Sequence, residues 1–220
     1  PRHRRADVPP PPPPMPPAPA DATRQRLLDS AGPLFAAHGY RDTGVKQICD
    51  AAQCNVAAIN YHFGSKQDFY AAVLAHAHRA RFQGTPMPAD EPGAPAATRF
   101  ATWLRWWISA LFDPRGPAWV QTLMVREMAQ PTDALDAVVQ RSIRPMYEHL
   151  CELVRALLGK GASTRTVREC ANSVVGQIML YKHSAPVIQR LGAMPADSPA
   201  GIRQLADHVL AFSLAGIAAR

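Results

Sequence analysis

A run of short amphipathic segments between residues 21 and 69 constrains the fold of this 220-residue chain more than any other feature. We expect the first helix to begin near Asp21, whose carboxylate can cap the free amides of the first turn. It ends near Gly39, because glycine readily takes the left-handed backbone that closes a helix, and Tyr40 then folds back onto the preceding turn. The apolar stripe of this helix must be buried, and it comprises Leu27, Leu28, Ala31, Leu34 and Phe35.

Two further helices follow within the same segment. The second opens at Thr43, and a tight turn at Gln53-Cys54 then leads to a third helix that Asn55 caps. The second helix carries the apolar residues Val45, Ile48, Ala51 and Ala52. Two short helices joined by three or four residues are typical of a helix-turn-helix, in which the second of the pair enters the major groove of DNA.

The third helix, residues 56–63, has the composition of a helix that approaches base edges closely. Ile59 and Phe63 lie four residues apart and form its buried stripe. We expect Ala57 and Ala58 to touch thymine methyl groups and Asn60 to pair with adenine through two hydrogen bonds, which discriminates by roughly 1 to 3 kcal/mol. The residues that face outward are Asn55, Val56, Ala57, Ala58, Asn60, Tyr61 and His62.

Phosphate contacts are expected next to this surface. Tyr61, His62 and Lys66 can reach phosphates, which fix the position of a protein on DNA without reading its sequence. Ser65 and Asp68 have the spacing of a capping box for a fourth helix over residues 66–82, with Asp in place of the usual Glu or Gln. The free amides at such a helix start also favour a phosphate.

These pieces carry a family resemblance. The segments TRQRLLDSAGPLFAAHGY, VKQICDAA and AAINYHFGSKQDFYAAVL resemble, in this order, the amino-terminal domain of TetR-family transcriptional regulators. Two residues depart from the family pattern: Gln53 stands where the turn usually has glycine, and Gly44 replaces a common Ser or Thr. The resemblance implies phosphate contacts from Thr43, Tyr61, His62 and Lys66. It implies contacts to bases or nearby backbone from Lys46, Asn55, Val56, Ala57, Ala58 and Asn60.

Composition agrees with a DNA-binding protein without requiring one. The formal net charge is +7, but Lys and Arg outnumber Asp and Glu by ten to six in residues 1–83 and by fourteen to eleven in the rest, so the excess is spread. No apolar run is long enough to span a membrane and no secretory signal opens the chain, so we expect a cytoplasmic protein without a membrane partner. The four cysteines show neither a CxxC pair nor a zinc spacing, and we expect no metal and no cofactor.

The sequence divides into three parts. Residues 1–20 contain ten of the 22 prolines and are expected to form a disordered tail. Residues 21–68 form the helix-turn-helix domain, and residues 69–220 form a helical regulatory and dimerisation domain. Pro145 lies inside a long helical pattern and should kink it. The last two helices are expected over residues 163–190 and 198–218, each with a serine cap. The chain is therefore predicted to be all-α.

The last two helices predict a homodimer. The pattern is apolar on more than one side, which indicates that these helices need a partner surface, such as a four-helix interface with a second copy. A two-fold dimer presents two reading helices about 34 to 36 Å apart, or a multiple of that spacing, and so matches a near-palindromic operator. The interface is predicted to comprise Val174, Ile178, Tyr181, Ile202, Leu205, Val209 and Phe212.

The carboxy-terminal half also resembles the CerR (CecR) branch of the TetR family. VREMAQPTDALDAVV, IRPMYEHL and ANSVVGQIMLYKHSAPVI carry this likeness, which implies a domain that binds a small molecule and dimerises. Ligand pockets are mostly apolar with a few polar anchors. On that basis the candidate lining residues are Trp103, Trp106, Trp107, Trp119, Met124, Arg126, Met128, Tyr147, Met179 and His183.

The resulting hypothesis is a TetR-type repressor that a small-molecule effector releases from a double-stranded DNA operator. Ligand entry between the Trp-rich helix and the kinked helix is expected to shift the fourth helix, which joins the domains. One alternative is a constitutive DNA-binding dimer in which the aromatic residues are all core. A second alternative, a small-molecule enzyme fused to a DNA-binding module, lacks a nucleophile elbow, a phosphate-cradling loop and a metal set. We therefore expect no enzyme activity and no catalytic residue.

Overall fold

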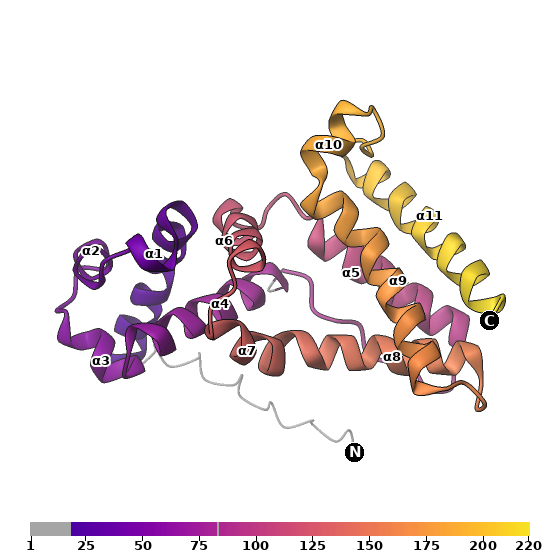
Figure 1. Cartoon of the computed structure of the whole chain (residues 1–220), viewed down its shortest axis with the longest axis horizontal. Coiled ribbons are helices and arrows are strands. Elements are labelled where there is room, and N and C mark those ends of the chain that lie inside the picture. The colour runs from indigo at the N-terminus through magenta and orange to yellow at the C-terminus, as the bar shows by residue number, and fades with distance from the viewer. Residues whose placement is uncertain (1–18, 83) are drawn as a thin grey trace, which may run out of the picture.

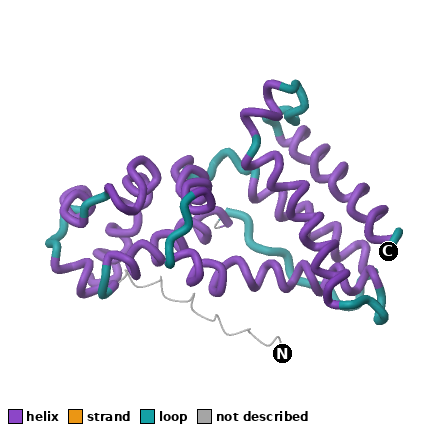
Figure 2. Tube along the Cα trace, in the orientation of Figure 1, coloured by secondary structure: helices purple, strands orange, loops and turns teal. Residues whose placement is uncertain are grey.

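The computed structural model describes residues 19–82 and 84–220, and within these ranges the chain is helical with no strand (Figure 2). The predicted all-α fold is confirmed. A disordered tail is expected over residues 1–20. Residues 1–18 of this range lie outside the described residues, and residues 19 and 20 belong to the first turn of α1. Figure 1 shows an elongated molecule with α1, α2 and α3 at one end and α9, α10 and α11 at the other.

The amino-terminal end is built from four helices around one core. They are α1 (Pro19–Asp42), α2 (Val45–Ala51), α3 (Ala57–Phe63) and α4 (Lys66–Phe82). Gly39 has φ 84° and closes the main part of α1, as expected, while Tyr40 packs against Phe35 with ring centroids 6.4 Å apart. The predicted stripe of α1 is buried at Leu27, Leu28, Ala31 and Phe35.

Two helices from later in the chain complete this first core. They are α6 (Ala118–Ala129), which packs against α1, and the short α7 (Ala134–Val138), which packs against α4. Val120 and Leu123 of α6 are buried among the residues of α1 and α4. The predicted domain boundary between residues 68 and 69 falls inside the continuous helix α4.

A second core occupies the carboxy-terminal half. Its helices are α5 (Ala96–Leu111), α8 (Arg144–Leu158), α9 (Thr164–His183) and α11 (Pro199–Ala218), and Figure 1 shows α9 and α11 running side by side. Ser163 and Ser198 cap α9 and α11, accepting hydrogen bonds from the amides of Thr166 and Gly201 at 3.0 and 3.1 Å. The buried apolar residues of these four helices face one another in this core.

The long helical pattern around Pro145 is interrupted as expected. A π-helical segment, η1 (Val139–Ile143), separates α7 from α8, and Pro145 follows in the first turn of α8. Proline has no amide hydrogen, and its ring would clash with the carbonyl of Arg141 in a regular helix. The wider π turn relieves that clash.

One helix boundary differs from the prediction. The helix expected over residues 163–190 ends at His183, and α10 (Ala185–Arg190) follows after a break at Ser184, which has φ −105° and ψ 19°. Pro186 lies in the first turn of α10, and its missing amide and ring prevent a regular helix from continuing through it. A hydrophobic pattern does not register this break, because Ile188 remains buried after it.

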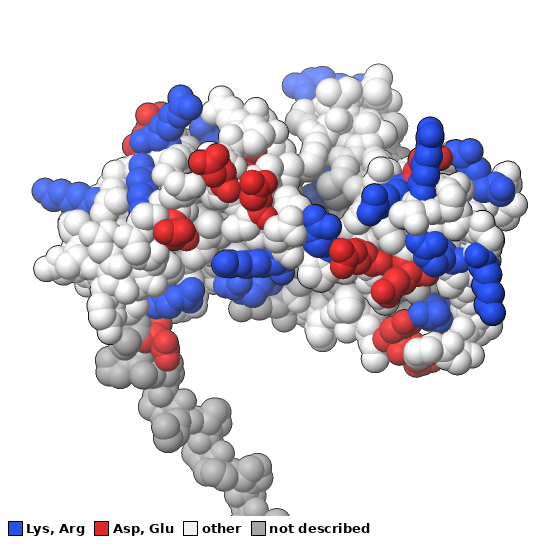
Figure 3. Space-filling view, turned by 60° about the horizontal axis from the view of Figure 1, so that its bottom comes forward, with Lys and Arg blue, Asp and Glu red and all other residues white. Residues whose placement is uncertain are grey.

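The surface carries mixed charge. On the face shown in Figure 3, Lys and Arg lie among Asp and Glu over both halves of the molecule. This distribution agrees with the spread excess of positive charge in the sequence and does not single out one basic face there. Among the described residues, no helix combines the length and hydropathy that a membrane span requires.

Candidate nucleic-acid interface and ligand cavity

The turn between α2 and α3 holds an unusual backbone. Gln53 has φ 52°, the left-handed region that glycine prefers, and it stands at the position where the sequence departs from the family pattern. The turn is closed by a hydrogen bond from the Cys54 amide to the Cys49 carbonyl at 3.0 Å. Asn55 is expected to cap the next helix, but Val56 holds the N-cap position of α3; the Asn55 side-chain oxygen still accepts the Ala57 amide at 2.9 Å just before it. The turn therefore has the geometry of a helix-turn-helix.

Helix α3 is anchored along one side and open along the other. Ile59 is buried in the first core, and the ring of Phe63 lies 4.6 Å from that of Phe69 in α4. On the other side Tyr61 is 81% exposed and Val56 is 46% exposed, an unusual position for large apolar or aromatic side chains. The predicted contact residues that are exposed at α3 are Asn55, Val56, Ala57, Asn60 and Tyr61, and Lys46 of α2 is exposed as well.

Two residues expected on this open surface are more enclosed. Ala58 is half-buried and packs against the first core. His62 is also half-buried, and its ring contacts those of Tyr61 and Phe63 at 4.9 and 6.2 Å. The predicted buried stripe of Ile59 and Phe63 was too narrow, because Ala58 and His62 of this short helix are also partly buried.

The expected phosphate contact from Thr43 needs correction. The Thr43 side chain is fully buried, and its hydroxyl donates to the carbonyls of Gly39 at 2.7 Å and Leu34 at 3.3 Å. Gly39 is the residue at which α1 leaves helical geometry, so the hydroxyl supplies a donor to a carbonyl at the end of the helix. In this structure Thr43 fixes the end of α1 and does not reach the surface.

The start of α4 brings further cations beside α3. Lys66 is half-buried, with its ammonium 4.8 Å from the centre of the Tyr40 ring and 3.4 Å from the Arg41 carbonyl, to which it donates. Ser65 accepts the Asp68 amide at 3.0 Å, as the capping spacing predicts. Arg24 of α1 is a residue that the sequence did not indicate, and its guanidinium lies 5.1 Å from the centre of the Phe63 ring. Tertiary packing alone brings Arg24 next to α3.

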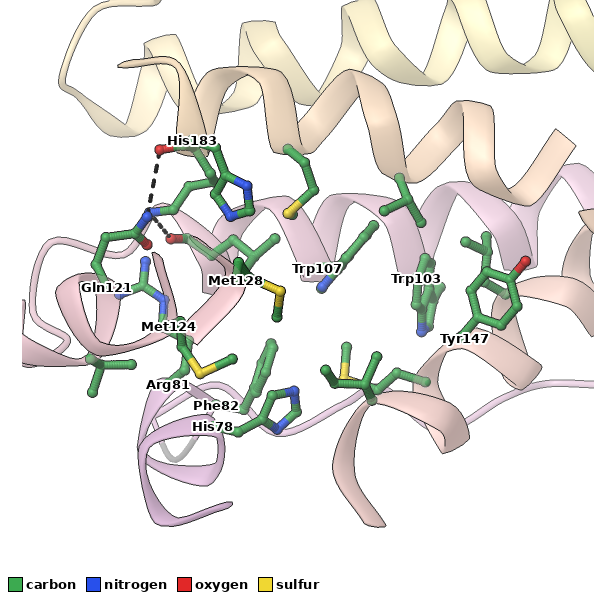
Figure 4. Close-up of a pocket in the computed structure, with 18 residues that line it drawn as sticks. His78, Arg81, Phe82, Trp103, Trp107, Gln121, Met124, Met128, Tyr147 and His183 are labelled. Atoms are coloured by element: carbon green, nitrogen blue, oxygen red, sulfur yellow. Dashed lines mark hydrogen bonds between the residues drawn. The ribbon is translucent and has the colours of Figure 1, made fainter. Parts of the chain in front are cut away.

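A cavity of about 350 Å³ lies where the two cores meet, between α4, α5, α6, α8 and α9 (Figure 4). This volume falls in the range of about 300 to 1,000 Å³ that small-molecule sites occupy. The lining residues that were predicted are Trp103, Trp107, Met124, Met128, Tyr147, Met179 and His183. The lining residues that were not predicted are His78, Arg81, Phe82, Leu111, Val120, Gln121, Ile143, Met146, Leu150, Val175 and Lys182.

Three predicted lining residues lie elsewhere. The Trp106 indole donates to the Thr85 carbonyl at 2.8 Å, outside the cavity. Trp119 faces α1, where it packs so closely that a Cβ at Gly32 would lie 2.6 Å from its ring. Arg126 also faces α1 and donates to the Ala37 carbonyl at 3.1 Å. The predicted lining residues lie on α5, α6, α8 and α9, and none was predicted on α4, which supplies His78, Arg81 and Phe82. Helix α6 has two apolar sides, and one of them belongs to the first core.

The face of α6 toward the DNA-reading domain also carries a buried carboxylate. Glu127 is 1% exposed and accepts three hydrogen bonds, from the Tyr70 hydroxyl at 2.8 Å, the Thr132 amide at 2.8 Å and the Thr132 hydroxyl at 2.9 Å. Burial and the bond to Glu127 raise the pKa of Tyr70 beyond its usual range. Glu127 thereby holds α6 and the following loop against α4.

The predicted dimer residues separate into two groups. Val174, Ile178, Leu205 and Val209 are buried within the second core of a single chain, so they cannot meet a second copy. Tyr181 and Ile202 are half-buried, and Phe212 is 63% exposed. The longest apolar stripe of each of these helices packs in the core of its own chain. Among the exposed residues of α9 and α11, the small or apolar ones are Ser173, Gly176, Leu180, Ala211, Phe212, Ala215 and Ala218, and they lie on the same helices as exposed polar residues such as Arg168, Arg203, Asp207 and His208.

Comparison with known families agrees with this architecture. Residues 27–73 match the profile of bacterial regulatory proteins of the tetR family, and residues 96–217 match the C-terminal domain of the HTH-type transcriptional dual regulator CecR. The dual regulator CecR of Shigella flexneri is 25% identical over 175 residues, 74% of this chain and 76% of that protein. The transcriptional repressor NicS of Pseudomonas putida is 37% identical over 57 residues, 26% of this chain and 27% of that one.

Solved structures show the same fold at low identity. The transcriptional regulator FadR of Bacillus subtilis, in complex with stearoyl-CoA, has a TM-score of 0.64 at 15% identity and covers 87% of this chain and 98% of its own. A TetR-like regulator of Rhodococcus has a TM-score of 0.61 at 20% identity, covering 90% of this chain and 97% of its own. Because the CecR profile alone spans more than half of the residues, the chain belongs to the TetR family of transcriptional regulators, with a helix-turn-helix DNA-binding domain and a CecR-type carboxy-terminal domain.

Proposed function

We propose that the protein is a homodimeric repressor that binds a near-palindromic operator through α3 and is released by a small molecule in the cavity. The observation that carries this proposal is the position of α4 and α6. Each contributes residues to the cavity and also packs against α1 in the DNA-reading domain. A ligand that moves either helix therefore moves the reading helices.

Contacts to DNA are assigned by exposure. Asn60 and Ala57 lie on the open side of α3, where an amide can pair with adenine and a methyl group can touch thymine. Tyr61 and Lys46 are exposed beside them and suit phosphate or nearby backbone contacts. The half-buried Ala58, His62 and Lys66 contribute through the parts of their side chains that remain accessible.

The dimer is proposed to form through the exposed side of α9 and α11. Small residues such as Gly176 and Ala215 allow helices of two copies to approach closely, while Phe212 and Leu180 supply apolar area. A two-fold arrangement places two copies of α3 about 34 to 36 Å apart, or a multiple of that distance, along one side of the DNA.

Release requires the ligand to prefer one state of the dimer. A coupling free energy of about 1 to 3 kcal/mol corresponds to a 5- to 150-fold loss of DNA affinity. The regulator AibR, solved with isovaleryl coenzyme A and operator DNA, has a TM-score of 0.59 at 16% identity to this chain. The cavity favours this sensor over a constitutive DNA-binding dimer, whose regulatory core would need no such space.

The proposal is tested by selecting bound fragments from a genomic DNA pool and comparing variants on the selected site. We expect Asn60→Ala to flatten preference at one base pair and to cost about 1 to 3 kcal/mol there. We expect Tyr61→Ala to weaken binding to all sites alike, because phosphate contacts carry no sequence information. Lys160→Ala, an exposed residue in the loop after α8, is the control and should change neither quantity.

The measurement is DNA binding by fluorescence anisotropy against a panel of single base-pair changes. If Asn60→Ala leaves the preference intact while Tyr61→Ala alters it, the two contact roles are reversed. If the unmodified protein binds no selected fragment above a random duplex at low salt, the regulator proposal fails.

A further inference from the structure

The charge of the cavity lining is one-sided. Among the 18 lining residues there is no Asp or Glu, whereas Arg81 and Lys182 are both present. Figure 4 shows Arg81, Gln121 and His183 at one end of the cavity and Trp103 and Tyr147 at the other, with aromatic and Met side chains between them. The cavity therefore has a polar, positively charged end and an apolar body.

Lys182 is held at the polar end by a single hydrogen bond. Its ammonium donates to the carbonyl of Leu111, the last residue of α5, at 2.9 Å and lies 4.9 Å from the centre of the Phe112 ring. Burial and the nearby Arg81 lower the pKa of Lys182 to about 8. The protein around Lys182 therefore does little to stabilise the positive charge of its ammonium group.

The surrounding protein stabilises the positive charge of Arg81 even less. It is half-buried and makes no hydrogen bond or ion pair with a described residue. The nearest acid, Asp113, is bound by Arg115 at 2.7 Å and does not line the cavity. A Cβ at Gly116 would lie 2.7 Å from an Arg81 Nη atom, so the missing side chain leaves room for the guanidinium.

The remaining polar groups are mostly hydrogen-bond donors. The ring nitrogen of Trp107 points toward the cavity (Figure 4), and the indole N–H has no acceptor among the described residues. The indole nitrogen of Trp103 is buried and also has no partner in the described chain. Burial lowers the pKa of His78, which keeps its ring neutral at neutral pH. Unpaired donors and desolvated cations are costly, and a ligand that supplies acceptors and negative charge relieves both.

We propose that the cavity binds an anionic amphiphile, with its carboxylate or phosphate between Arg81 and Lys182 and its apolar body against Trp107 and Phe82. This inference rests on the proposed ligand-sensing function and names the chemical class of the ligand. The negative group comes either from a free carboxylic acid or from the phosphates of an acyl-CoA. A volume of about 350 Å³ accommodates a hydrocarbon or aromatic body but leaves a coenzyme A nucleotide outside.

The test uses full-length protein and isothermal titration calorimetry with four probes that share one hydrocarbon chain. They are dodecanoate, dodecanoyl-CoA, 1-dodecanol and dodecyltrimethylammonium. We expect one or both anionic probes to bind at least tenfold more tightly than the neutral alcohol, and the cationic probe to bind most weakly. Preference for dodecanoate identifies a free acid, and preference for dodecanoyl-CoA identifies the thioester. Tighter binding of the alcohol or the cation overturns the inference.

Two variants locate the anion. Arg81→Met and Lys182→Met keep the aliphatic stem and remove the charge, and each should weaken the preferred anionic probe by roughly 10- to 100-fold while leaving 1-dodecanol unchanged. Arg79→Met on the exposed side of α4 and Lys160→Met are the matched controls. Because Lys182 also holds the Leu111 carbonyl, circular dichroism checks its fold, and Arg81→Met tests the site independently. Unchanged anion affinity in Arg81→Met contradicts the proposed site.

The ionisation of Lys182 gives a separate prediction. An anion beside Lys182 favours its charged form, so affinity for dodecanoate should be constant well below pH 8 and fall above it, by up to about tenfold per pH unit. Arg81 of α4 is the charged group that acts on Lys182, and the other titratable side chains lining the cavity are His78 of α4, Tyr147 of α8 and His183 of α9. Lys182→Met should lose this dependence, and a profile that stays flat in the unmodified protein up to pH 9.5 contradicts it.

These measurements involve no DNA, so they separate the two proposals. If dodecanoate or dodecanoyl-CoA binds as expected but does not release the selected operator, the coupling fails and the ligand class stands. If another kind of molecule releases the operator without requiring Arg81 or Lys182, the sensor function stands and the ligand class fails.

Discussion

Phe212→Asp should convert the protein to a monomer and lower its affinity for a full operator by about 100-fold or more. Phe212 is 63% exposed on α11, in the proposed interface. Around a two-fold axis each substitution occurs twice, so the change both removes apolar area and places two negative charges in one interface. A dimer holds its second half-site as an intramolecular event, which typically adds 10²- to 10⁴-fold in affinity, and a monomer loses that gain.

Sedimentation velocity and anisotropy on the full site measure the two effects together. Met87→Asp is the matched control, because Met87 is 49% exposed in the loop between α4 and α5 and lies in no proposed interface. Binding of Phe212→Asp to a single half-site should equal that of the unmodified protein, since α3 is untouched. If the variant remains a dimer at micromolar concentration, the interface lies on another surface.

Glu127→Leu should reduce the free energy of unfolding by about 2 to 5 kcal/mol. The carboxylate accepts from the Tyr70 hydroxyl and from the amide and hydroxyl of Thr132, all in a buried setting. Leucine has a similar size but no acceptor, so two or more buried donors lose their partners at about 1 to 3 kcal/mol each. These bonds join α6 to α4, and the ligand response should weaken along with stability.

Urea denaturation followed by far-UV circular dichroism measures the loss. Glu127→Gln is the matched variant, because its amide oxygen still accepts a hydrogen bond, and it should retain most of the stability. Glu152→Leu, an exposed residue of α8, should change the free energy of unfolding by less than about 0.5 kcal/mol. A loss below about 1 kcal/mol in Glu127→Leu would show that water replaces the lost carboxylate.

Local features of the fold follow closely from the sequence. The helix expected over residues 66–82 has those bounds in the structure, and the interruption before Pro145 is present as a π-helical segment. The serine caps at Ser163 and Ser198 also lie where expected. These features depend on residues a few positions apart, and their causes are the missing proline amide and the free amides of a helix start.

Features that depend on which helix faces pack against each other were harder to predict from the sequence. A hydrophobic stripe shows that a side of a helix is buried, but not against what. Val174 and Ile178 therefore fitted a dimer interface as well as the core in which they lie, and Trp119 fitted a ligand site as well as its contact with Gly32. Arg81 and Lys182 are 101 positions apart in the chain and carry no shared motif, so their meeting in one cavity is a property of the tertiary structure.

The separation between the cavity and the exposed side of α3 affects how such a protein can diverge. No proposed base-contacting residue lines the cavity, and most of the lining comes from α5, α8 and α9, which take no part in the first core. Under the proposed function, substitutions there would change the effector without changing the promoter that is recognised. A few amino-acid substitutions in the cavity would thus be enough to give paralogues that control the same genes but respond to different small molecules.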